Sequence, residues 1–161
     1  MAKAKNFKGF TLIEILVVVA LIAILTAITF IAINPAKNFA DTRNAQRSSD
    51  VGQILNAMTQ YTSDSGRTTA ALETEFAVAI PSCDAVAPSP TAIQIGSGVG
   101  LLNLGDATKA LVDEYIVGIP FDPSTGTAAA TNYWVCQTTG GRLQVSAPGV
   151  ENGKPVIVVK R

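Results

Sequence analysis

A single carboxylate, that of Glu14, stands four residues into an apolar run that begins at Phe10. An acidic side chain inside a bilayer costs on the order of 3 kcal/mol or more, and such residues are candidates for a functional role with a partner to be named. Hydration at the edge of the bilayer explains why Glu14 is tolerated, but it does not explain why an acidic residue occurs at this position. Glu14 is therefore the residue of this segment whose function has to be explained.

Catalytic and metal-binding patterns are weak by comparison. The chain has no histidine, which removes His-based triads, histidine zinc sites and the usual general base. Residues 96–100 resemble a phosphate loop only superficially, because they lack the following Lys-Ser/Thr and the strand-helix unit around it. Asp113, Glu114 and Asp122 have no EF-hand spacing, so capping and solvation explain them more simply than calcium. We predict no enzyme, no cofactor and no metal site.

The apolar run around the carboxylate ends at Ile33 and contains 24 residues, of which four are polar. At about 1.5 Å per residue it forms a helix of roughly 36 Å, enough for a hydrocarbon layer of about 30 Å. A secretory signal peptide is the alternative, but its apolar stretch has only about 7 to 15 residues and ends in a small-residue cleavage site. The segment from Phe10 to Ile33 is therefore predicted to span a membrane.

Charges on either side of the span predict its orientation. Lysines at positions 3, 5 and 8 precede it, whereas the basic residues that follow are mixed with acidic ones. The positive-inside rule then keeps the N-terminus in the cytoplasm and places the C-terminal part outside.

The two cysteines, Cys83 and Cys136, both lie in this outward part, where disulfides persist. We expect them to be bridged, with two buried free thiols as the alternative. A bridge would close a loop of about 53 residues and stabilise the fold by about 4 kcal/mol in the chain-entropy model.

The opening residues carry a family resemblance. KGFTLIE at residues 8–14, followed directly by the apolar run, resembles the class III signal of type IV pilins and of type II secretion pseudopilins. The resemblance implies that a prepilin peptidase cuts after Gly9 and methylates the new amino group of Phe10. It also implies that Glu14 of one subunit neutralises the Phe10 ammonium of a neighbour when subunits leave the membrane for a helical filament.

Elementary electrostatics agrees with this implied pairing. A free α-amino group has a pKa near 8 and is cationic at neutral pH. When apolar helices pack into a dry bundle, a charge left without its partner costs about 3–5 kcal/mol, whereas a pair is tolerated. We therefore interpret Glu14 as an assembly residue that selects subunit register.

A second helical segment follows the span. Asn34-Pro35 should weaken or kink the helix, and beyond it an apolar stripe with i, i+3, i+4, i+7 spacing continues toward residue 63. The stripe consists of Val51, Ile54, Leu55, Met58 and Tyr61. The charged residues Arg43, Arg47 and Asp50 are predicted on the other face, solvated or in contact with neighbouring subunits, with Arg47 and Asp50 close enough to pair.

The resemblance extends over this segment. Residues 42–67 are similar to the helix that follows the anchor in many pilins and pseudopilins, which often runs Arg-Asp-Ala-Gln-Arg and ends in Tyr, Asp, Asn-Gly and Tyr-Pro. Asn44 replaces the usual acid, and Arg67-Thr68-Thr69 departs from the Tyr-Pro.

After a Gly- and Pro-rich region come three predicted strands, at residues 132–137, 142–147 and 155–159. A turn or short helix is expected near residues 70–79 and a short helix at 106–115. The strands form an antiparallel meander whose apolar face packs on the helical stripe. The predicted fold is α+β and pilin-like: a long N-terminal helix with a protruding hydrophobic half and an amphipathic half on a sheet of three to four strands.

The predicted organisation is a leader at 1–9, a membrane and filament-core helix at 10–33, an amphipathic helix at 34–63 and a head at 64–161. The head comprises a connecting loop (64–131) and a sheet (132–161). Removing the leader lysines leaves nine basic residues against 12 acidic ones, so nucleic-acid binding is not indicated.

We expect a structural subunit of a type IV pilus-like filament that is made as a single-pass inner-membrane precursor. It becomes part of an extracellular filament or a periplasmic pseudopilus. Its partners are copies of itself, the prepilin peptidase and the pilus assembly machinery. The alternatives are a type II secretion pseudopilin and, in a different class, a monomeric membrane-tethered binding module.

Overall fold

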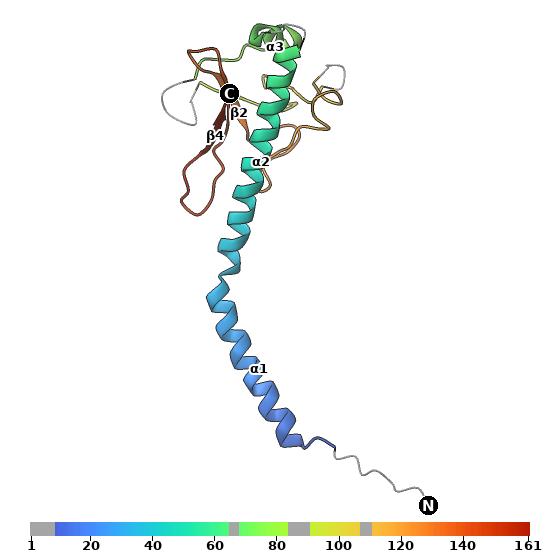
Figure 1. Ribbon diagram of the computed structural model, residues 1–161, viewed down its shortest axis with the longest axis vertical. Helices are drawn as coiled ribbons and strands as arrows, with labels where there is room; N and C mark the ends of the chain where they lie inside the picture. Colours follow the sequence, from blue (N-terminus) through green and yellow to red (C-terminus); the bar gives the residue numbers. More distant parts are fainter. Residues whose placement is uncertain (1–8, 65–67, 84–90, 107–110) are drawn as a thin grey trace, which may run out of the picture. The chain divides into compact units, whose positions relative to one another are not determined.

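The computed structural model describes residues 9–64, 68–83, 91–106 and 111–161 (Figure 1). The chain forms two compact units, Met1–Phe39 and Ala40–Arg161. The elements in chain order are α1 (Leu12–Ile33), α2 (Pro35–Ser63), α3 (Thr69–Phe76), β1 (Ile93–Gln94), β2 (Trp134–Gln137), β3 (Leu143–Ala147) and β4 (Ile157–Lys160).

The first unit contains α1 and the start of α2, which are separated by one residue. Asn34 ends α1 in the left-handed conformation, with φ 44° and ψ 74°, and Pro35 begins α2. The Asn34 side chain then accepts a hydrogen bond from the Lys37 amide at 3.3 Å, while Asn38 Nδ2 donates to the Ile33 carbonyl at 3.0 Å. The predicted interruption at Asn34-Pro35 is confirmed, and Asn34 stabilises it by bonding to the first turn of the next helix.

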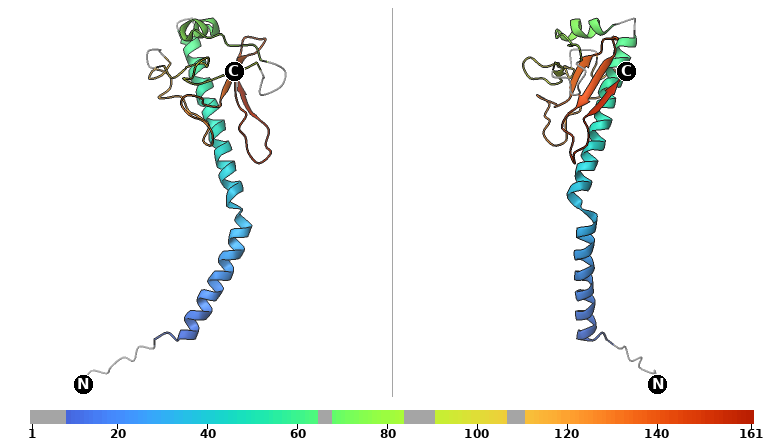
Figure 2. Two further views of the ribbon diagram at one scale, coloured as in Figure 1. Left: turned by 180° about the vertical axis from the view of Figure 1, so that it is seen from behind. Right: turned by 90° about the vertical axis from the view of Figure 1, so that its left-hand side faces the viewer.

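The second unit, Ala40–Arg161, is called the head from here on and is built on the remainder of α2. All five residues of the predicted stripe, Val51, Ile54, Leu55, Met58 and Tyr61, are buried, at 0–3% exposure. They form one hydrophobic cluster with the inward side chains of the sheet and of the loops. Figure 2 shows the strands lying along α2 in its right-hand view. The predicted packing of the helix on an antiparallel sheet is therefore confirmed, and the fold class is α+β.

The sheet has four antiparallel strands in the order β1-β2-β3-β4. Its register places Ile93, Val135, Val145 and Val159 in one row across the four strands. Because these side chains share a face, the row packs against the α2 cluster. β1 falls in the region predicted as a connecting loop, and its two residues are too few to show an alternating pattern.

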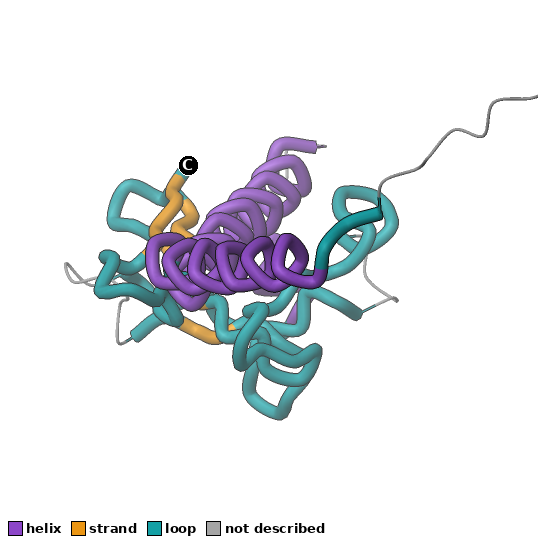
Figure 3. Tube along the Cα trace, turned by 90° about the horizontal axis from the view of Figure 1, so that it is seen from below, coloured by secondary structure: helices purple, strands orange, loops and turns teal. Residues whose placement is uncertain are grey.

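A disulfide joins Cys83 to Cys136, with Cα atoms 5.0 Å apart. Main-chain bonds support the same junction, since the Cys83 amide donates to the Gln137 carbonyl and the Gln137 amide donates to Pro81, both at 2.8 Å. The expected bridge is thus present, and it fastens the segment before residue 84 to the end of β2. Figure 3 shows that much of the head outside α2 and the sheet is loop.

The helix predicted at 106–115 is wrong over its described part. Leu111 to Ile116 forms a tight turn in which Val112 and Ile116 make a β-bridge. Asp113 has a φ of 73°, which a right-handed helix does not accommodate. Residues 107–110 of that prediction lie outside the described residues.

Candidate processing and assembly site

Gly9 and Phe10 lie in a non-helical segment immediately before α1. Phe10 is 85% exposed, and nothing lies within 4 Å of the position that a Cβ would take at Gly9. Exposed backbone outside regular structure is where proteolytic cleavage concentrates. The peptide bond between these two residues is therefore open to an enzyme.

Thr11 caps α1 and holds Glu14 in a reciprocal arrangement. The Glu14 amide donates to Thr11 Oγ1 at 3.3 Å, and the Thr11 amide and hydroxyl both donate to Glu14 Oε2 at 2.9 Å. This is a capping box, in which the residue at N-cap and the acid three positions later satisfy each other's backbone groups. The carboxylate also lies at the positive end of the helix dipole.

The capping role of Thr11 was missed in the sequence interpretation. Its signal was present, because Thr-x-x-Glu before an apolar run is the pattern of a capping box. Within one chain, the cap accounts for a carboxylate at this position. It joins Glu14 to Thr11, the second residue after the predicted cleavage point, at the first turn of α1.

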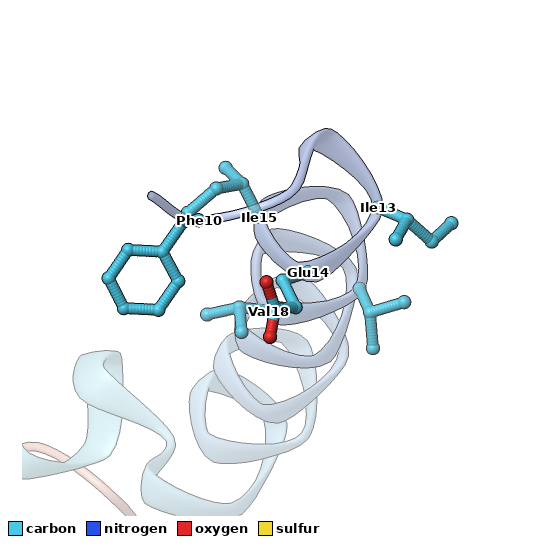
Figure 4. Close-up of a pocket in the computed structure, with 6 residues that line it drawn as sticks. Phe10, Ile13, Glu14, Ile15 and Val18 are labelled. Atoms are coloured by element: carbon cyan, nitrogen blue, oxygen red, sulfur yellow. The ribbon is translucent and has the colours of Figure 1, made fainter. Parts of the chain in front are cut away.

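The surface beside the carboxylate is otherwise apolar. A hollow of about 390 Å³ is lined by Phe10, Ile13, Glu14, Ile15, Val17 and Val18. Figure 4, looking along the helix, shows the Phe10 ring and the Ile13 side chain on opposite sides of Glu14. Glu14 is the one charged side chain of these six, so its carboxylate is the polar feature that an apolar neighbour would meet here.

No residue of α1 is buried within the structure. Its two interior threonines, Thr26 and Thr29, bond to the carbonyls of Ile22 and Leu25, at 2.7 and 2.8 Å, so their hydroxyls are satisfied inside the helix. Among the described residues, α1 is the one helix that is long and apolar enough to cross a membrane. Its apolar surface needs lipid or other helices around it.

A comparison with protein families identifies the motif formed by Gly9, Phe10 and Glu14 at the start of α1. Residues 4–30 match the family model described as the prokaryotic N-terminal methylation motif. The chain carries an N-terminal methylation motif. This motif, also called the class III signal peptide, is typical of type IV pilins and pseudopilins, which are structural proteins rather than enzymes. No curated protein and no solved structure matched the chain.

Gly9, Phe10 and Glu14 of this prepilin-like protein all fall inside the matched motif. The motif implies processing by a prepilin peptidase and subsequent assembly, and the hydrophobic helix is consistent with an inner-membrane anchor. The head, by contrast, lies beyond residue 30, so its features are described from the structure alone.

The head of the prepilin-like protein holds a buried ion pair that the sequence did not predict. Arg47 is fully buried, and its guanidinium donates to both oxygens of Asp122, at 2.6 and 3.1 Å. It also donates to Ser124 Oγ at 2.7 Å and to Glu151 Oε1 at 3.0 Å. The predicted Arg47–Asp50 pair is wrong, because Arg47 turns inward to two loops that lie far away in sequence.

Asn44 and Arg43 hold the second of these loops to α2. Asn44 Nδ2 donates to the Glu151 carbonyl at 3.1 Å, and the Glu151 amide donates back to Asn44 Oδ1 at 3.0 Å. Arg43 donates two hydrogen bonds to the Glu151 carboxylate, one from Nε at 2.7 Å and one from Nη2. We call the set Arg43, Asn44, Arg47, Asp122 and Glu151 the polar clamp. These contacts explain why position 44 is an asparagine. Its amide supplies both a donor and an acceptor to Glu151, whereas a carboxylate would supply only acceptors.

The carboxylates of the polar clamp have perturbed pKa values. Burial alone would raise the pKa of Asp122, but hydrogen bonds from Arg47, Ser124 and Thr125 outweigh it and hold the pKa well below its usual range. The pKa of Glu151 falls to about 2, chiefly through its bond from Arg43. Both carboxylates are therefore ionised throughout the physiological range.

Asp50, the predicted partner of Arg47, instead accepts a hydrogen bond from the Tyr133 hydroxyl at 2.7 Å. Burial raises the pKa of Asp50, and the bond from Tyr133 offsets part of this effect. The three charged residues predicted on one exposed face of the helix are thus divided: Arg47 and Asp50 are buried and Arg43 is half-buried.

Proposed function

We propose that this prepilin-like protein is a structural subunit of a type IV pilus-like filament. In this proposal a prepilin peptidase removes residues 1–9, the new amino group of Phe10 is methylated, and subunits polymerise through residues 10–33. The amphipathic helix at 34–63 and the rest of the head at 64–161 form the filament's outer part.

The observation that carries the proposal is the arrangement of Phe10, Thr11 and Glu14 at the start of an apolar helix that has no buried residue. Cleavage after Gly9 creates an ammonium beside this helix end. When lipid is exchanged for other helices, an ammonium and a carboxylate from adjacent subunits can neutralise each other in an environment that disfavours either charge alone.

Substitutions at Glu14 test the proposal. Glu14→Gln keeps an oxygen acceptor for the Thr11 cap but removes the charge, so we expect membrane insertion to persist and sheared filaments to be lost. Thr11→Ala is the matched control, because it removes the cap hydroxyl and keeps the carboxylate; its filaments should persist. Normal filament yield from Glu14→Gln and Glu14→Leu would contradict the assembly role.

The location of the polymer separates the pilus from a secretion pseudopilin, since the methylation motif is typical of both. Recovery of the chain in filaments sheared from the cell surface supports the pilus. A polymer confined to the periplasm supports the pseudopilin, and a chain found only as a membrane-bound monomer supports a tethered binding module.

A further inference from the structure

The contacts between α2 and the rest of the head change character at Asp50. From Val51 onward the buried side chains of α2 all belong to the hydrophobic cluster. Before it, the buried residues of α2 are Ala40, Asn44, Arg47 and Asp50, and none of these four belongs to that cluster. The first part of α2 within the head is therefore held by polar contacts, for which water can substitute.

One loop is attached to this part of α2 by hydrogen bonds and ion pairs. It consists of residues 148–156, which connect β3 to β4, and we call it the strap. In Figure 1 and in the right-hand view of Figure 2 the strap extends beyond the strands along α2. Lys154 Nζ lies 2.7 Å from Asp41 Oδ1, and Asn152 Nδ2 donates to the same oxygen at 3.2 Å. Glu151 adds its bonds to the polar clamp. All residues of the strap are described, and none belongs to the hydrophobic cluster.

Two ion pairs of the strap are open to solvent. The side chains are 35% and 28% exposed in the Arg43–Glu151 pair, and 50% and 35% exposed in the Lys154–Asp41 pair. Pairs with this exposure are individually weak, and dissolved salt screens them. The attachment of the strap should therefore weaken as the ionic strength rises, whereas the packing of the hydrophobic cluster does not depend on charge.

The strap also covers the buried ion pair of the polar clamp. A Cβ added at Gly149 would lie 2.7 Å from Asp122 Oδ2 and 3.7 Å from Arg47 Nε, so the backbone of the strap lies directly on this pair. Arg47 and Asp122 are 0% and 1% exposed. Opening of the strap would let water reach both ions, and their hydration would offset part of the contacts that are lost.

We propose that the strap is a salt-sensitive cover, which opens away from α2 while the hydrophobic cluster remains folded. When closed, it excludes water from the Arg47–Asp122 pair. When open, it leaves this part of α2 attached through that pair and through the Asp50–Tyr133 bond. A segment held by exposed polar contacts opens at a lower free energy than the core. This inference concerns the single subunit, so it does not depend on the proposed filament function.

Hydrogen exchange of the full chain in detergent micelles, followed by NMR at single amides, tests the proposal. The Glu151 amide donates to Asn44 Oδ1, so it exchanges when the strap opens. The Val145 amide lies in β3, between β2 and β4, and reports unfolding of the core. We expect the Glu151 amide to exchange faster than the Val145 amide. It should also exchange about fivefold faster in about 1 M sodium chloride than in about 0.1 M, because the Debye length falls from about 10 Å to about 3 Å.

Equal exchange rates at the two amides would show that the strap opens only when the whole head unfolds, which overturns the proposal. A Glu151 rate that does not change with salt also overturns it, because ion pairs would then not control the opening. Polymerisation plays no part in either measurement, so these results leave the filament function untouched.

A substitution at Gly149 should open the strap without salt. Gly149→Ala places a methyl group against the Asp122 carboxylate, which hydrogen bonds from three residues hold in place. The strap should therefore yield, and exchange at Glu151 should rise about tenfold. Gly140→Ala is the matched control, because nothing lies within 4 Å of the Cβ position there. Unchanged exchange at Glu151 in Gly149→Ala would contradict the covering role.

Lys154→Met decides the question if Gly149→Ala also speeds exchange at Val145 and so disturbs the core. Lys154 is exposed, and its removal deletes one ion pair of the strap. Exchange at Glu151 should rise about twofold at low salt and should respond less to added salt. Lys160→Met, at an exposed lysine of β4 outside the strap, should behave like the wild type. A Lys154→Met chain with the rate and salt response of the wild type overturns the proposal.

Discussion

At the scale of single residues, Glu14 has two successive roles in this account. In the structure its carboxylate accepts both bonds from Thr11, and an N-terminal cap contributes about 0.5–2 kcal/mol to stability. An unpaired charge in a dry helical bundle costs about 3–5 kcal/mol. The charge therefore outweighs the cap once subunits pack together, which is why we assign assembly to the carboxylate and helix initiation to Thr11.

Arg47→Met should be among the most destabilising substitutions in the head. It leaves the fully buried Asp122 without its cation, and breaking such a pair costs about 3–5 kcal/mol. Chemical denaturation of the full chain in detergent measures this loss in the free energy of unfolding.

The control for this prediction is Arg43→Met. Its pair with Glu151 is half-exposed, with side chains 35% and 28% accessible, so its loss should be about 1 kcal/mol or less. Equal losses for the two variants would show that burial of the Arg47 pair does not matter.

At the scale of elements, the polar clamp fixes two loops on α2, and its carboxylates should make the head sensitive to acid. Glu151 has a pKa of about 2 in the folded head against an ordinary 4.5, so its contribution is complete above about pH 4.5 and is lost as the pH falls toward 2. Asp122 acts in the same direction at lower pH. Asp50, whose pKa is raised, acts in the opposite direction.

We therefore expect the urea concentration at the unfolding midpoint to decrease as the pH is lowered from 4.5 to 2, because the pKa of Glu151 is lowered in the folded head. Glu151→Gln removes this titration, so its midpoint should be lower at neutral pH and should change less over the same range. The measurement is urea denaturation at a series of pH values. An identical pH dependence in the variant would show that another group controls acid stability.

The disulfide acts on a different part of the head, the segment leading to Cys83. It closes a separation of 53 residues, for which the chain-entropy model gives about 4 kcal/mol. Replacing both cysteines with serine should lower the free energy of unfolding by up to about this amount and leave the methylation motif unaffected. An unchanged unfolding midpoint would contradict the role of the bridge.

The sequence predicted those elements whose pattern is local. The α2 stripe is periodic over several turns, so spacing alone identified its buried side. The three longer strands were located by their apolar and β-branched runs, but alternation did not identify a single buried side in β3, whose five residues are all buried. Arg47 was misplaced because its partner Asp122 is 75 residues away, and no local pattern records such a contact. The turn at Asp113 depends on one residue with a positive φ. At the candidate site the motif residues were identified and the Thr11 cap, although local, was overlooked.

At the scale of the whole molecule, the chain combines an apolar helix with no buried residue and a head with its own hydrophobic core. The first must be surrounded by lipid or by other helices, whereas the second is stabilised by its disulfide and its polar clamp. We infer that the same helix is the membrane anchor before cleavage and the polymer core after it.

Mass spectrometry of the intact chain from sheared filaments tests the central claim most directly. The account predicts a chain that begins at Phe10, lacks residues 1–9 and carries one methyl group on its amino terminus. A chain that retains its first nine residues and is recovered only from the membrane fraction, never from a polymer, would contradict the account.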